Sequence, residues 1–141
     1  MNEQDQSSIG GGWLGIYACK GSLRDQPPVR FEATLSELDS EGKFSGTILD
    51  DGALGEALVS GSQSGSGVRF SKSYRKHRKL TVSYEGTLSE DSRVMQGTWW
   101  IADDAHGVWD ARRLWHTGET AERAEKAQEE VKRIREVVRL G

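Results

Sequence analysis

One lysine stands where an apolar side chain is expected. Residues 68–74 alternate so that Val68, Phe70, Lys72 and Tyr74 share one face of an expected strand. An ammonium group on such a face either extends to the rim of the fold or meets an anionic partner. Together with nearby aromatic and phenolic groups, it could anchor the polar part of a small ligand. The candidate ligand-binding residues are Tyr17, Phe70, Lys72, Tyr74, Tyr84, Trp99 and Trp109.

A second constellation could perform acid–base chemistry. Asp103 and Asp104 precede His106 closely enough to place carboxylates and an imidazole at one end of a fold. The same run is ordinary turn chemistry, and no nucleophile accompanies it, so we assign no catalytic residue. The histidines, which also include His77 and His116, lack the His/Cys spacing of a zinc site. We therefore expect neither a metal nor a cofactor.

Residues 75–79 form a dense basic run, Arg-Lys-His-Arg-Lys, between two expected strands. Such a run can contact phosphate or nucleic acid, or it can be a solvated loop. The whole chain carries a net charge of −3, which favours the solvated loop. Nucleic acid is accordingly not an expected partner.

Composition indicates one domain with an aromatic core and many turns. The 141 residues include 17 glycines, five tryptophans and only two prolines. Cys19 is the single cysteine, so an intrachain disulfide is excluded, and we expect a buried strand residue there. The N-terminus lacks the pattern of a signal peptide, and no window approaches a membrane span. We expect a cytoplasmic protein without a membrane partner.

Two-residue alternation between Trp13 and Trp115 predicts an all-β fold, an eight-stranded antiparallel up-and-down barrel that removes its own edges. Residues 1–10 are expected to be a flexible tail, residues 11–116 the barrel, and residues 117–141 an amphipathic helix. Asp50 belongs to an expected turn, and Gly61–Gly67 to an expected hairpin loop. The expected strands are Trp13–Cys19, Val29–Leu38, Lys43–Leu49, Glu56–Ser60, Val68–Tyr74, Leu80–Leu88, Val94–Ile101 and Val108–Trp115.

The alternation also predicts an aromatic interior, and glycines in recurring Gly-Thr segments (46–47, 86–87 and 97–98) would let a strongly coiled sheet bend. A barrel of eight strands can be filled by its own side chains or can hold one small ligand, and both alternatives stay open here. The expected interior residues are Trp13, Tyr17, Phe31, Phe44, Phe70, Tyr74, Val82, Tyr84, Trp99 and Trp109.

In residues 117–141 the spacing of apolar residues changes from the two-residue period of the expected strands. Apolar residues at three- and four-residue steps, including Val131 and Ile134, form a helical stripe. This stripe could dock on the outer wall of the barrel over Leu14, Ile16 and Trp100, or it could pair with a second copy of the chain. A homo-oligomer formed through the helix is therefore one expected partnership.

The entry to the first strand resembles that of the calycin superfamily, which includes lipocalin, fatty-acid-binding and avidin-type barrels. Gly11-Gly12-Trp13 matches the Gly-x-Trp signature, and Arg112-Arg113 is similar to its second half on the last strand. The resemblance implies that Arg112 or Arg113 packs over Trp13 and closes one barrel end. Lys20–Pro28 is too short for the helix-turn-helix of fatty-acid-binding proteins, and the lipocalin Thr-Asp-Tyr motif is missing. The resemblance thus implies the barrel but no particular ligand.

Three functions follow from these patterns. The leading hypothesis is a calycin-like barrel that binds a small, largely apolar or aromatic ligand. The first alternative is an interaction module that assembles through its C-terminal helix. The second alternative is an enzyme that uses the Asp103/His106 rim.

Overall fold

The computed structural model describes residues 8–52, 54–77, 80–102, 105–117 and 129–134. Eight strands account for most of these residues, and one short 3₁₀ helix follows the first strand. The elements are β1 (Gly11–Cys19), η1 (Gly21–Leu23), β2 (Val29–Leu35), β3 (Lys43–Asp50), β4 (Glu56–Ser64), β5 (Gly67–Tyr74), β6 (Thr81–Leu88), β7 (Val94–Ile101) and β8 (Ala105–His116).

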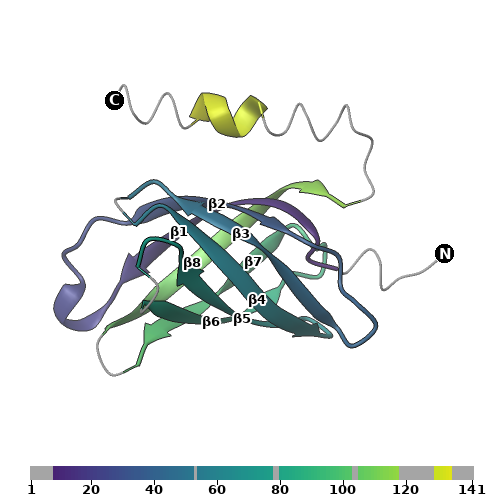
Figure 1. The fold of residues 1–141 in the computed structure, drawn as a ribbon, viewed down its shortest axis with the longest axis horizontal. Coiled ribbons are helices and arrows are strands. Elements are labelled where there is room, and N and C mark those ends of the chain that lie inside the picture. Colours follow the sequence, from purple (N-terminus) through teal and green to yellow (C-terminus); the bar gives the residue numbers. More distant parts are fainter. Residues whose placement is uncertain (1–7, 53, 78–79, 103–104, 118–128, 135–141) are drawn as a thin grey trace.

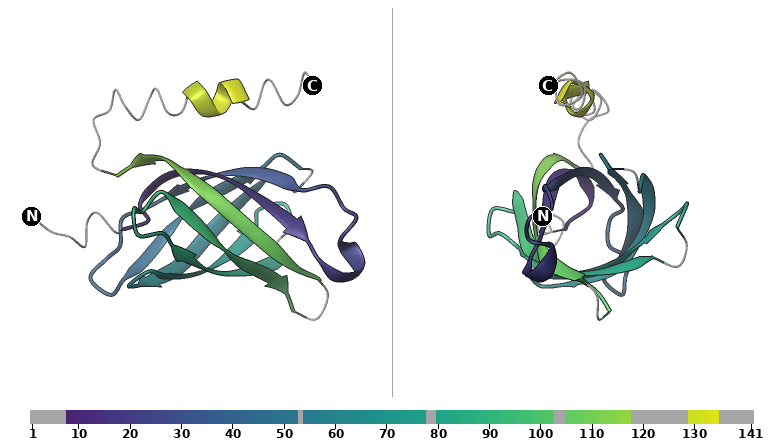
Figure 2. Two further views of the ribbon diagram at one scale, coloured as in Figure 1. Left: turned by 180° about the vertical axis from the view of Figure 1, so that it is seen from behind. Right: turned by 90° about the vertical axis from the view of Figure 1, so that its left-hand side faces the viewer.

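The strands form one closed antiparallel sheet in sequence order. Closure is made by β1, which pairs with β2 on one side and with β8 on the other. The β1–β8 ladder runs from the Gly11–His116 pair to the Cys19–Gly107 pair. Figure 1 shows the barrel from the side, and in the right-hand view of Figure 2, seen end-on, the strands surround a single interior. The predicted eight-stranded up-and-down barrel is confirmed, and closure gives hydrogen-bond partners to both strands that would otherwise be edges.

The hairpin between β4 and β5 is shorter than the sequence indicates. The loop predicted over Gly61–Gly67 is wrong, because β4 continues to Ser64 and β5 begins at Gly67. Ladder bonds use backbone groups, so small polar residues can extend a strand where the neighbouring strand offers a partner. Gly65 turns the chain with a φ of +59°, as a two-residue hairpin requires. The predicted turn at Asp50 is likewise wrong, since Asp50 is the last residue of β3.

Paired glycines lie where two neighbouring strands leave no room for a side chain. Gly86 and Gly97 face each other across β6 and β7. A methyl group added at Gly97 would lie 1.9 Å from the backbone oxygen of Glu85. The indole of Trp109 lies over this bare backbone, where its Nε1 donates to the carbonyls of Glu85 (3.3 Å) and Thr98 (3.2 Å). The strongly coiled sheet therefore uses two of the recurring Gly-Thr segments as the sequence predicts.

The interior is lined by the residues that the alternation predicts. Every one of the ten expected interior residues is buried except Tyr17, which packs against the core while staying partly exposed. The core is a single cluster enclosed by the sheet.

One end of the barrel is filled by the residues that precede β1. Ile9 is fully buried, and its backbone N–H donates to Oε1 of Gln63 at 3.1 Å. Its carbonyl accepts from Nε1 of Trp13 at 2.8 Å. The predicted tail of residues 1–10 is thus incorrect for residues 8–10, because Ile9 finds an apolar place inside the barrel; residues 1–7 lie outside the described residues. We call the end of the barrel that contains Ile9 the sealed end.

Arg113 completes the sealed end. Its guanidinium donates to the carbonyls of Ser8 (2.6 Å) and Gly10 (2.8 Å), and its Nε donates to the carbonyl of Ser92 (2.8 Å). The same group lies 4.4 Å from the centre of the Trp13 ring. Arg113 therefore holds the segment before β1 in place by hydrogen bonds and by a cation–π contact.

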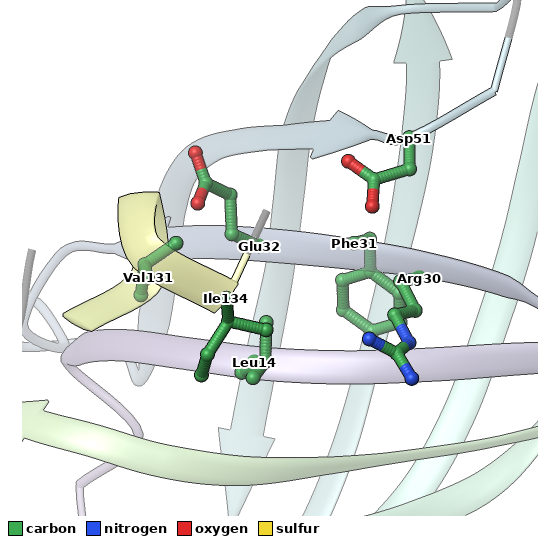
Figure 3. Close-up of a pocket in the computed structure, with 7 residues that line it drawn as sticks. All are labelled: Leu14, Arg30, Phe31, Glu32, Asp51, Val131 and Ile134. Carbon is green, nitrogen blue, oxygen red and sulfur yellow. The ribbon is translucent and has the colours of Figure 1, made fainter. Parts of the chain in front are cut away.

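The C-terminal helix is described over residues 129–134, and the rest of the predicted helix lies outside the described residues. It lies outside the barrel wall (Figures 1 and 2). Val131 is buried, and Val131 and Ile134 line a narrow hollow together with Leu14 (Figure 3). Of the expected docking residues, Ile16 and Trp100 do not line this hollow. No helix in the described part of the chain is long and apolar enough to cross a membrane.

Candidate functional site

The end of the barrel opposite the sealed end contains buried charge. Strands β1, β3, β5 and β7 finish there, and we call it the polar end. Alternation along β3 directs Asp50 inward with Phe44 and Ile48, and alternation along β5 directs Lys72 inward with Phe70. The side chains of Asp50 and Lys72 are 0% and 1% exposed. Both charged groups therefore lie within the barrel and not at its rim.

Three side chains converge on one oxygen of Asp50. The Tyr17 hydroxyl donates to Asp50 Oδ2 at 3.1 Å, and the Tyr74 hydroxyl donates to the same atom in a short hydrogen bond. The Nζ atom of Lys72 lies 3.5 Å from Oδ2. These donors come from β1 and β5, so the carboxylate joins opposite parts of the wall. Such charge-assisted hydrogen bonds offset part of the cost of burying the carboxylate.

Aromatic rings surround the Lys72 ammonium group. Its Nζ lies 4.7 Å from the ring centre of Tyr17, 4.8 Å from that of Tyr74 and 5.1 Å from that of Tyr84. The negative faces of aromatic rings attract a cation, and the attraction grows when water is excluded. Lys72 is thus held between one carboxylate and three rings.

Burial is the main cause of the pKa shifts of Lys72 and of the three tyrosines around it. Loss of hydration lowers the pKa of Lys72 to about 8, and the nearby Asp50 carboxylate compensates only in part. Burial raises the pKa of Tyr74 and Tyr84 far above that of a free phenol, and it raises that of Tyr17 as well. The charge of Asp50 adds to each of these increases. The phenols therefore stay protonated, while a large fraction of the Lys72 amine is neutral in weakly basic solution.

The second oxygen of Asp50 is unsatisfied. Asp50 Oδ1 is buried and has no hydrogen-bond partner among the described residues. A buried carboxylate oxygen without a partner costs about 1–3 kcal/mol or more, so such atoms are rare in folded proteins. The polar end thus has an acceptor in place for a donor that the described chain does not supply.

Below the charged pair, the interior is filled by aromatic rings. Phe70 and Tyr84 are stacked with ring centres 4.7 Å apart, and Trp109 meets both rings edge to face at 5.6 and 5.7 Å. Phe44 packs edge to face on Phe70 at 6.2 Å. This half of the core is held by contacts among the chain's own rings.

Several apolar side chains lie at the rim of the polar end. Trp99 packs edge to face on Tyr17 at 5.9 Å, and its Nε1 donates to the carbonyl of Ala18. Around these rings lie partly exposed apolar residues that pack against the core. They are Cys19, Leu54, Leu80, Ile101 and Ala105, contributed by strand ends and by the loops between them.

The structure brings the predicted ligand-binding residues together. Tyr17, Tyr74 and Tyr84 surround Lys72, while Phe70 and Trp109 pack on Tyr84, and Trp99 packs on Tyr17. Of the two alternatives for Lys72, the structure contains the anionic partner and not an extension to the rim. That partner, Asp50, is absent from the sequence prediction. One more step of the two-residue alternation from Phe44 through Ile48 would have placed it inside.

The other candidates from the sequence do not assemble into a site in the described structure. Arg113 lies over Trp13, whereas Arg112 is exposed. His106 is exposed on β8, and Asp103 and Asp104 lie outside the described residues. Of the basic run, Arg75 pairs with Glu56 on the surface, and residues 78–79 lie outside the described residues. Among the described residues, no three His, Cys, Asp or Glu side chains are grouped to hold a metal.

Comparison with known proteins supports the fold. No protein-family model matches the chain, and no curated protein sequence matches it. Among solved structures, a de novo designed fluorescence-activating β-barrel superimposes with a TM-score of 0.57 at 15% identity. The match covers 80% of this chain and 99% of the designed chain. At this identity the likeness concerns the barrel architecture.

Proposed function

We propose that the protein binds a small molecule at the polar end of its barrel, with an apolar body and one hydrogen-bond donor directed at Asp50. The observation that carries this proposal is the buried Asp50 Oδ1 without a partner, beside the ion pair with Lys72. A donor from a ligand would satisfy this oxygen in surroundings where water competes weakly. Sites for small molecules commonly combine apolar walls with a few placed polar groups.

The apolar rim supports an apolar body for the ligand. Partly exposed side chains such as Leu54, Leu80 and Ile101 surround the polar end and would lose water-exposed surface when a ligand covers them. The ring stack of Phe70, Tyr84 and Trp109 already fills the adjacent part of the interior. The ligand is accordingly small and lies toward the rim, near Tyr17.

Closure of the sealed end supports entry of the ligand at the polar end. Ile9 and Arg113 close the opposite end with hydrogen bonds to Gln63 and to three backbone carbonyls. The resemblance to calycins and the likeness to a designed fluorescence-activating barrel are consistent with a small molecule held inside such a wall. Both concern architecture, so the chemistry of the ligand is argued from Asp50 and Lys72.

A pair of matched probes tests this proposal. Indole and benzothiophene have nearly the same shape, but only indole carries an N–H donor. We expect isothermal titration to show saturable binding of indole, at least about fivefold tighter than that of benzothiophene, because one hydrogen bond to a charged acceptor contributes roughly 1–3 kcal/mol. Equal affinities for the two probes would show that Asp50 Oδ1 accepts no hydrogen bond from the ligand. Absence of saturable binding of both probes would contradict the proposal.

A variant supplies the control. The double substitution Asp50→Leu and Lys72→Met replaces the ion pair with apolar side chains of similar size, which buried pairs often tolerate. We expect this variant to fold and to lose the preference for indole over benzothiophene. If the variant still prefers indole over benzothiophene, the group that accepts the indole N–H is not Asp50.

A further inference from the structure

Lys72 carries an amine in surroundings that surface lysines lack. Its side chain is 1% exposed, whereas that of Lys43 is 65% exposed. Binding of a neutral ligand through Asp50 makes no use of this amine. A lysine enclosed by apolar groups is, however, the usual nucleophile for carbonyl compounds in proteins, since loss of hydration favours its neutral form.

We propose that the Lys72 amine forms a reversible imine with small aromatic aldehydes that enter the polar end. This inference rests on the proposed binding of small molecules at that end. The aromatic rings of Tyr17, Tyr74 and Tyr84 surround Nζ, so an aryl aldehyde meets the amine among groups that suit its own ring.

The reaction needs no oxidant or second substrate. A proton first moves from the Lys72 ammonium group to Asp50, and the freed nitrogen lone pair forms a bond to the carbonyl carbon. The carbonyl electron pair moves to oxygen, which takes up the proton that the nitrogen loses, and a neutral carbinolamine results. Asp50 then returns the proton that it took from Lys72 to this oxygen, the carbon–oxygen bond breaks, water leaves, and the nitrogen lone pair forms the carbon–nitrogen double bond. The sum converts one aldehyde and one ammonium group into one protonated imine and one water.

The charge balance of the site favours this product. A protonated imine keeps one positive charge at the position of Nζ, 3.5 Å from Asp50 Oδ2. The buried ion pair is therefore preserved, whereas most other modifications of a buried lysine would leave the carboxylate uncompensated. The exclusion of bulk water at this position also slows hydrolysis of the imine.

Asp50 Oδ1 lies where it can transfer protons during the formation of the imine. It is the unpartnered oxygen of the carboxylate that already contacts Nζ through Oδ2. It can take the proton that the nitrogen loses on addition, and it can return a proton to the departing oxygen. The phenols of Tyr17 and Tyr74 keep Oδ2 hydrogen-bonded and leave Oδ1 available for this exchange.

Reductive trapping tests the inference on the full chain. The protein is incubated with benzaldehyde and sodium cyanoborohydride at pH 7.5, and labelled lysines are identified by peptide mass spectrometry. We expect Lys72 to be labelled about tenfold faster than Lys43 or more, because a pKa of about 8 leaves far more neutral amine than the ordinary value of 10.5. Benzyl alcohol, which has the same ring but no carbonyl group, should slow the labelling of Lys72 and not that of Lys43.

The outcomes separate this inference from the proposed function. Labelling of Lys72 no faster than that of Lys43, in protein that binds indole, overturns the imine and leaves binding at the polar end intact. Absence of both labelling and indole binding removes both proposals. The variant with Lys72→Met and Asp50→Leu, checked as folded by its tryptophan fluorescence, should lose the fast label and keep the slow labelling of Lys43, which assigns the fast label to residue 72.

Discussion

At the sealed end of the barrel, a partly buried cation donates to three backbone carbonyls, whereas at the polar end a buried anion has one oxygen without a donor among the described residues. Arg113 donates to three backbone carbonyls and stacks on Trp13. Asp50 accepts three donors on one oxygen and none on the other among the described residues. The first arrangement is what a structural closure needs, and the second is what a binding site keeps for a ligand.

The two ends also differ in how they meet solvent. Ile9 and Trp13 are fully buried at the sealed end, while Tyr17 and the other rim residues of the polar end stay partly exposed. Two other polar atoms near the sealed end, His116 Nε2 and Thr117 Oγ1, also lack partners among the described residues, but they belong to partly exposed residues. The unsatisfied oxygen of Asp50, in contrast, belongs to a side chain that is 0% exposed.

The largest expected effect comes from breaking the ion pair at the polar end. Asp50→Leu leaves the Lys72 ammonium group buried without its carboxylate, so we expect the free energy of unfolding to fall by about 3–5 kcal/mol. Urea denaturation followed by tryptophan fluorescence measures the loss. The double variant with Lys72→Met should recover part of it, because the unpaired charge is gone while the hydroxyls of Tyr17 and Tyr74 still lack their acceptor. A double variant as unstable as the single one would show that the loss does not come from the unpaired charge.

At the sealed end, Arg113→Met should cost about 3 kcal/mol, because three partly buried carbonyl hydrogen bonds are lost and Trp13 loses its cation. Arg112→Met is the matched control, since Arg112 is exposed on the neighbouring position of β8. It should change the unfolding free energy by less than about 0.5 kcal/mol. The affinity for indole should stay unchanged in both variants, provided they are folded. Equal destabilisation by both would contradict the closure by Arg113.

The ion pair also predicts a pH dependence. In the folded chain Lys72 loses its proton with a pKa of about 8, whereas the unfolded chain keeps it up to 10.5. Between these values the unfolded state binds more protons, so raising the pH favours the folded state. Relative to Lys72→Met, the wild type should gain roughly 2 kcal/mol of unfolding free energy between pH 8 and 10. A constant difference over this range would mean that the amine is not desolvated.

The smallest effect is expected outside the barrel. Val131→Ser should weaken the contact of the C-terminal helix with the wall near Leu14, at a cost of about 1 kcal/mol. Glu129→Ser, on an exposed position of the same helix, is the control. Neither change should alter indole binding. A homo-oligomer through this helix stays a prediction, and light scattering tests it: a lower mass for Val131→Ser alone would favour pairing of two copies.

Periodicity predicts the fold well because burial of one face imposes a two-residue pattern on every strand. The interior aromatic residues follow from it, and so does Lys72. The choice of Arg113 over Arg112 could have been made in the same way, since Arg113 shares its parity with Trp109. Asp50 was missed because Asp-Asp-Gly is a strong turn signal, and a local signal of this kind says nothing about a lysine two strands away.

The role of residues 8–10 could not be predicted. Ile9 is one apolar residue within a polar stretch, and this segment is held by Gln63 on Ile9 and by Arg113 on Ser8, both distant in sequence. The unsatisfied oxygen of Asp50 is also a property of three-dimensional positions, since it follows from where Tyr17, Tyr74 and Lys72 place their donors. The type of site was predictable from the residues, but its two most informative features were not.

The most direct test of binding at the polar end is a titration of ¹⁵N-labelled protein with indole, followed by amide chemical shifts. The account predicts saturable shifts at Tyr17, Asp50, Lys72 and Tyr74, with the amide of Ile9 at the sealed end unchanged. Shifts confined to the sealed end or to the outer wall near Val131, or no saturable shift at all, would contradict it.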